Sequence, residues 1–80
     1  MDVEALRKLI GTKRDSALLR ATIATALLRE DRLEEAEEQL VEATTMDPAY
    51  TAAWKQLGNL RLAVDNPTGA RDAWQSGIEA

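Results

Sequence analysis

The sequence predicts an all-α fold, an α-solenoid of antiparallel helical hairpins with about five helices. The first supporting observation is a 34-residue period that relates the middle of the chain to its end. The second is that no segment alternates polar and apolar residues with period two, and β-branched residues are few. The period indicates that one supersecondary unit is copied and stacked. The matching pairs are Ile23 and Leu57, Ala24 and Gly58, Asp31 and Asp65, Ala36 and Ala70, Leu40 and Trp74, and Ala43 and Gly77.

The composition limits the classes of function. Eighty residues allow one small domain without large clefts. The chain has no Cys and no His, which removes disulfides, thiolate metal sites and the commonest general base, so we expect no metal and no cofactor. The net charge is −4, without a basic stripe, which makes nucleic acid a poor candidate partner. No apolar run approaches the ~20 residues that span a bilayer. We therefore expect no membrane partner and a cytoplasmic location.

The first predicted helix covers Val3 to Ile10. Asp2 can cap its start, and Gly11 can supply its stop. Its apolar residues share one face. The polar run 12–15 then forms a loop.

The second helix opens at Ser16 or Asp15 and runs to about Arg29, followed by a tight turn at residues 30–32. It is apolar nearly all round, which is compatible with an amphipathic membrane segment or with a helix packed between neighbours on two sides. We favour the packed helix. The residues that recur with helical spacing are Leu19, Ile23, Ala26 and Leu27.

The third helix has an apolar stripe and a glutamate-rich opposite side. Glu34 and Glu38 lie four residues apart and could chelate a divalent cation or pair with a basic partner. They lack the loop, the supporting oxygen ligands and the turn glycine of a dedicated calcium site. A solvated helix face is the favoured interpretation. The apolar stripe consists of Leu33, Ala36, Leu40 and Ala43.

Two similar signals predict the starts of the fourth and fifth helices. Asp47-Pro48 and Asn66-Pro67 each place a capping side chain before a proline at the first helical position. The free amides of segment 66–69 could also receive a phosphate, but the same residues suffice as a cap and turn. We favour the cap.

The residues of the last two helices carry a family resemblance. Trp54-x-x-Leu57-Gly58, followed by Ala70-x-x-x-Trp74-x-x-Gly77, resembles the tetratricopeptide repeat (TPR), and the second half of the pattern also occurs 34 residues earlier. The resemblance implies one TPR-like domain over residues 1–80. It divides into an N-terminal helix and loop at 1–15, a first repeat at 16–46 and a second repeat at 47–80.

The sequence departs from the family pattern at three places. Arg61 stands where an aromatic is expected, and Arg20 and Ala24 stand where the first repeat should have Trp and Gly. The small residues of the pattern still allow paired helices to approach closely. For Gly58 and Gly77 this close packing offsets a helix-propensity cost of about 1 kcal/mol each.

The resemblance implies that the first helix of each hairpin lines a concave groove. Lys55 and Asn59 lie one turn apart and resemble part of a clamp that holds a terminal carboxylate in some family members. The matching positions of the first repeat, Ala21 and Thr25, carry no such pair, so two ordinary polar residues are the favoured interpretation. The groove residues implied by the resemblance are Leu18, Ala21, Thr22, Thr25, Lys55, Gln56, Asn59 and Leu62.

These observations predict a non-catalytic module that binds a partner peptide or helix in the groove. The alternative is a structural piece that dimerises or joins a longer repeat array. In that case the chain either continues into a capping helix or forms a homodimer through Trp74 and Ile78, which we expect to be partly uncovered. An enzyme is disfavoured because the sequence shows no nucleophile and base pair and no phosphate-binding loop.

Overall fold

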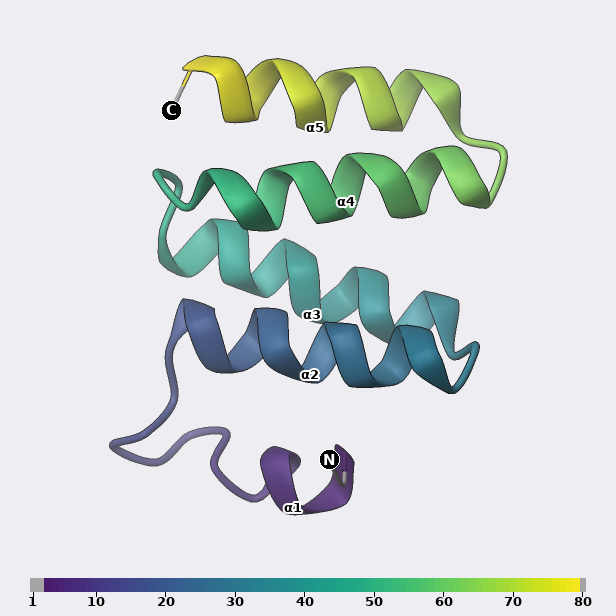
Figure 1. Cartoon of the computed structure of the whole chain (residues 1–80). Helices are drawn as coiled ribbons and strands as arrows, with labels where there is room; N and C mark the ends of the chain where they lie inside the picture. The colour runs from purple at the N-terminus through teal and green to yellow at the C-terminus, as the bar shows by residue number, and fades with distance from the viewer. Residues whose placement is uncertain (1–2, 80) are drawn as a thin grey trace.

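A computed structural model of the chain describes residues 3–79. Figure 1 shows the helices stacked in chain order, with the first and the last at opposite ends of the stack. The described residues contain no strand, which confirms the all-α prediction. None of the described helices has the length and apolar character that a membrane span requires. The helices are α1 (Val3–Arg7), α2 (Ala17–Arg29), α3 (Leu33–Met46), α4 (Thr51–Ala63) and α5 (Pro67–Glu79).

The 34-residue period reappears in the backbone of the two hairpin turns. Between α2 and α3 the N–H of Arg32 donates to the carbonyl of Leu27 at 3.0 Å, and between α4 and α5 the N–H of Asn66 donates to the carbonyl of Arg61 at 2.7 Å. Asp31 and Asp65 each have a φ of 60° at the equivalent place. A left-handed residue with this hydrogen bond ends a helix and reverses the chain. The turn predicted at residues 30–32 is confirmed.

One continuous core runs through the stack. Ile23, Leu27, Leu40 and Leu57 are its largest fully buried side chains. The small residues between paired helices are also enclosed, because Ala24, Ala36, Ala43 and Ala70 have no exposed surface. The helices of each hairpin therefore approach closely enough to exclude water along their length.

The prediction for the first helix was wrong in length. Helix α1 ends at Arg7, and four-residue turns follow in which the N–H groups of Leu9 and Ile10 donate to the carbonyls of Leu6 and Arg7. This tighter backbone still packs Leu6, Leu9 and Ile10 against the core. Gly11 follows with a φ of 80°. The predicted cap Asp2 lies outside the described residues.

The starts of the other helices confirm two of the predicted capping residues and contradict a third. Ser16 caps α2, because its hydroxyl accepts from the N–H of Leu19 at 3.0 Å. Asn66 caps α5 in the same way through the N–H of Gly69, as predicted. Asp47 does not open α4: it ends α3, and its side chain accepts from the N–H of Ala49 in a separate turn. The prediction that α4 starts at Pro48 was wrong, because the helix begins at Thr51.

Candidate partner-binding surface

Helices α4 and α5 interlock through two glycine and tryptophan contacts. The indole of Trp74 on α5 lies so close to Gly58 on α4 that no side-chain carbon could fit at that glycine. In the reverse direction, a Cβ at Gly77 on α5 would meet the Cβ of Trp54 on α4 at 3.0 Å. The two contacts fix how α4 is rotated against α5, and thus which of its side chains face solvent.

Two arginines hold the hairpins where the repeat pattern expects aromatics. The guanidinium of Arg20 forms two hydrogen bonds of 3.0 Å with the carboxylate of Asp15, and a third with Gln39 Oε1 at 3.3 Å. Arg61 donates from α4 to Glu37 Oε2 at 3.1 Å and to the carbonyl of Gly69 at 3.3 Å. Each arginine therefore links its helix to neighbouring segments by directed bonds instead of by ring packing.

The ion pair at Asp15 is electrostatically strong. The hydrogen bonds from Arg20, with the backbone N–H of Gly11 as a further donor, lower the pKa of Asp15 from 3.8 to about 2. The same pairing raises the pKa of Arg20. The guanidinium of Arg20 is therefore engaged within the chain, and the loop before α2 is tied to that helix.

On α2, the predicted groove residues have unequal exposure. Leu18 is 65 % exposed, which is unusual for a leucine beside a core, whereas Ala21 is buried and offers no contact surface. The hydroxyls of Thr22 and Thr25 are partly exposed, and each donates to the carbonyl four residues earlier on the helix. Because each hydroxyl proton is already donated to a backbone carbonyl, the hydroxyl oxygens can only accept hydrogen bonds from a partner.

On α4, the predicted residues are largely accessible. Lys55 and Asn59 are exposed one turn apart, and Leu62 is 52 % exposed near the end of the helix. Lys55 forms no ion pair with any residue between 3 and 79. The Oε1 atom of Gln56 is buried without a hydrogen-bond partner among the described residues. Lys55 therefore carries a charge that no described acidic side chain neutralises.

A hollow at the junction of the two hairpins includes residues that the sequence prediction missed. Its volume is about 630 Å³, and Leu18 and Met46 contribute exposed apolar surface to it. Met46 is the last residue of α3, and Tyr50 directly precedes α4. The hollow joins the start of α2 to the segment between the hairpins. It is lined by Ser16, Ala17, Leu18, Met46, Asp47 and Tyr50.

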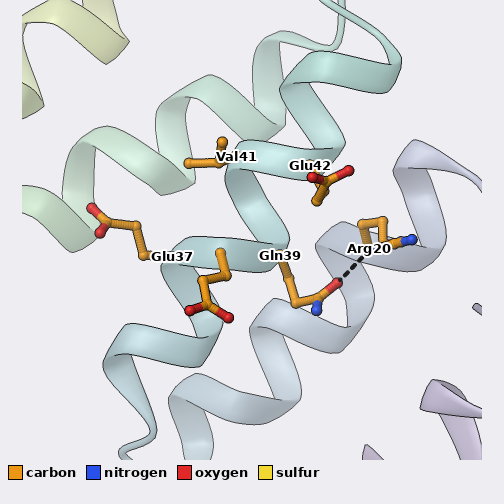
Figure 2. A pocket seen from close by; sticks show the side chains of 6 residues that line it. Arg20, Glu37, Gln39, Val41 and Glu42 are labelled. Atoms are coloured by element: carbon orange, nitrogen blue, oxygen red, sulfur yellow. Dashed lines mark hydrogen bonds between the residues drawn. The ribbon is translucent and has the colours of Figure 1, made fainter.

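A second hollow, of about 600 Å³, lies over the acidic side of α3. Figure 2 shows Glu37 and Glu42 pointing to different sides, with Arg20 reaching Gln39 from α2. Among the residues that the structure describes, no group of three or more acidic side chains is placed to hold a metal ion.

Comparison with known proteins assigns the family. No protein-family model matches the chain. The chain is 38 % identical over 78 residues to the TPR repeat-containing protein PA0015 of Pseudomonas aeruginosa, a match that covers 98 % of this chain and 74 % of the relative. It is 43 % identical over 47 residues to the heat-shock protein cognate (HSC) co-chaperone sgt12 of Aspergillus fumigatus, covering 59 % of this chain and 14 % of that protein. The chain belongs to the tetratricopeptide repeat family.

Proposed function

We propose that this chain is a non-catalytic interaction module that holds an extended or helical segment of a partner protein across α2 and α4. Residues 16–46 and 47–80 form its two repeats, and a cytoplasmic location belongs to the same proposal. Membership of the TPR family supports a protein-interaction role. The observation that carries the proposal is the exposure of Leu18, at 65 %, beside a hollow of about 630 Å³.

The chemistry of this surface suggests how a partner would bind. An apolar side chain of the partner would fill the hollow next to Leu18 and Met46 and remove exposed apolar surface from water. Backbone N–H groups of the partner would donate to the hydroxyls of Thr22 and Thr25. Lys55 and Asn59 would donate to a carboxylate. Apolar burial then supplies affinity, and the polar contacts set direction.

The experiment that tests the proposal is a nuclear magnetic resonance titration of the isotope-labelled chain. The probe is a C-terminal peptide of a heat-shock cognate protein, because one relative is named as a co-chaperone of such a protein. We expect shifts at amides of α2 and α4, and weaker binding for Leu18→Ser. Val41→Ser serves as the matched control, because Val41 is an exposed aliphatic residue on α3. Equal losses of affinity for the two variants would contradict the proposal.

A second experiment searches for the natural partner. Affinity capture with mass spectrometry would compare the wild type with the double variant Lys55→Ala and Asn59→Ala. A partner held through the groove is expected to be retained by the wild type and depleted with the double variant.

A further inference from the structure

The outer side of α5 combines a projecting side chain with a hollow. Ile78 is 82 % exposed, and Trp74 beside it is 37 % exposed. Figure 1 shows α5 at the end of the stack, packed on α4, with no other described helix against its opposite side. Next to Ile78 lies a pocket of about 240 Å³, lined by Thr51, Lys55, Trp74, Gly77 and Ile78.

The pocket has the size and lining for an aliphatic side chain. A cavity of about 150 Å³ already accepts benzene when its walls are apolar. Here the indole of Trp74 supplies one wall, and Gly77 contributes backbone without a side chain that would fill the space. The indole cannot turn inward to close the pocket, because it already rests against Gly58. The indole wall of the pocket is therefore held in place by α4.

The charges around this patch are complementary to each other. Lys55 borders the pocket and has no ion pair with a described residue. Glu79 directly follows Ile78; its Oε1 accepts from Gln75 Nε2 at 3.0 Å, and its other carboxylate oxygen can take a second donor. One surface thus carries an apolar projection with a neighbouring anion, and an apolar hollow with a neighbouring cation.

We propose that a second copy of this chain covers the patch in a dimer with two-fold symmetry. Ile78 of each copy enters the pocket of the other, and Glu79 of each copy pairs with Lys55 of the other. A two-fold interface uses the same patch on both copies, so the patch must be complementary to itself. The patch meets this condition, because one face carries both the projecting Ile78 with Glu79 and the pocket with Lys55. A different protein could bind through the pocket and Lys55 alone, without using Ile78 and Glu79.

The first test measures the monomer–dimer equilibrium by analytical ultracentrifugation over a wide range of concentrations. The wild type is expected to show a mass that rises with concentration. Ile78→Ser is expected to weaken dimerisation by about tenfold or more, because the side chain that fills the pocket is lost. Leu62→Ser is the matched control, since Leu62 is an exposed aliphatic residue of α4 outside the pocket. A wild type that stays monomeric throughout, or equal effects of the two variants, would overturn the proposal.

The second test exchanges the charges. Lys55→Glu and Glu79→Lys alone should each weaken dimerisation, because each places like charges opposite one another. Mixing the two variants should restore association as a heterodimer, since every contact then joins a lysine to a glutamate. Circular dichroism checks that both variants remain helical. Failure of the mixture to associate more strongly than either variant alone would refute the pairing between copies.

These outcomes are separable from those of the groove proposal. Ile78 is not one of the groove residues, but Lys55 belongs to both surfaces. Ile78→Ser should therefore bind the heat-shock cognate peptide at least as tightly as the wild type does, because Lys55 is released from the dimer. Loss of dimerisation with retained peptide binding supports both proposals. Loss of peptide binding in this variant would contradict the assignment of Ile78 to the dimer contact alone.

Discussion

The indole of Trp74 lies against the backbone of Gly58, at a distance that leaves no room for a Cβ atom on the glycine. The two residues belong to different helices of one hairpin, and their counterparts 34 residues earlier are Leu40 and Ala24. The equivalent positions of the first hairpin carry a smaller apolar residue and an alanine, where the second hairpin carries a larger apolar residue and a glycine.

This contact predicts the effect of Gly58→Ala. Alanine improves helix propensity by about 1 kcal/mol, but here the new methyl group would push the rigid indole off α4. We expect a net loss of unfolding free energy, because overpacking costs about 1–3 kcal/mol and the indole also loses its contact. Urea denaturation followed by circular dichroism measures the loss. In Trp74→Ala the same change at Gly58 should instead be neutral or stabilising, and a cost that persists there would show that the indole is not its cause.

Ala36 provides a second packing test. It is fully buried between α2 and α3, so Ala36→Leu should overpack the hairpin and lower the free energy of unfolding by about 1–3 kcal/mol. Glu34→Ala is the control because Glu34 is exposed. Glu35 is unsuitable as a control, since its carboxylate pairs with Arg32 and with Arg7. Similar losses for Ala36→Leu and Glu34→Ala would mean that the buried face of α3 is misassigned.

The lowered pKa of Asp15 predicts a dependence of stability on pH. Its folded pKa of about 2 lies below the ordinary aspartate pKa of 3.8, so the carboxylate stabilises the fold above about pH 4. This contribution is lost as the pH falls from about 4 through about 2, where Asp15 becomes protonated in the folded state as well. Asp15→Asn should therefore be less stable than the wild type near neutral pH, and the difference should shrink in acid. Urea titrations at a series of pH values check this, and a difference that does not change with pH would contradict it.

The pair Lys55 and Asn59 predicts a preference for a free C-terminus. A peptide with a terminal carboxylate should bind more tightly than its amidated form, because both side chains can donate to the carboxylate. The preference should weaken with added salt, since both residues are exposed. Isothermal titration calorimetry at two salt concentrations measures it. Equal affinities for the two peptides would remove the carboxylate contact while leaving the apolar part of the groove in place.

Much of the fold was predictable because the helix contacts repeat with the sequence. The small residues at Ala36 and Ala70 mark the close approach of each hairpin, and both are fully buried. The start of α4 was not predictable from its local signal. Asp47-Pro48 and Asn66-Pro67 are chemically alike, but the indole N–H of Trp54 donates to the carbonyl of Pro48 at 2.8 Å. That contact within the folded chain keeps Pro48 in a turn outside the helix.

The candidate surfaces were also only partly predictable from the sequence. Of the groove residues inferred from the repeat register, Leu18 and Leu62 are exposed, whereas Ala21 is buried. Met46 and Tyr50 were missed because they stand at the end of α3 and in the turn before α4, outside the first-helix faces that the resemblance assigns to the groove. The position of Lys55 beside Trp74 and Ile78 depends on how α5 lies on α4, and sequence spacing does not specify that geometry.

The packing contact between α3 and α4 also affects how the molecule unfolds. Each hairpin is held internally by extensive contacts, while the two hairpins meet through the smaller α3–α4 contact. In a stack of this kind, stability is approximately a sum of unit terms and nearest-neighbour terms. The α4–α5 hairpin can therefore open while α2 and α3 stay folded, so hydrogen exchange should divide the chain into two cooperative units with a boundary near Asp47.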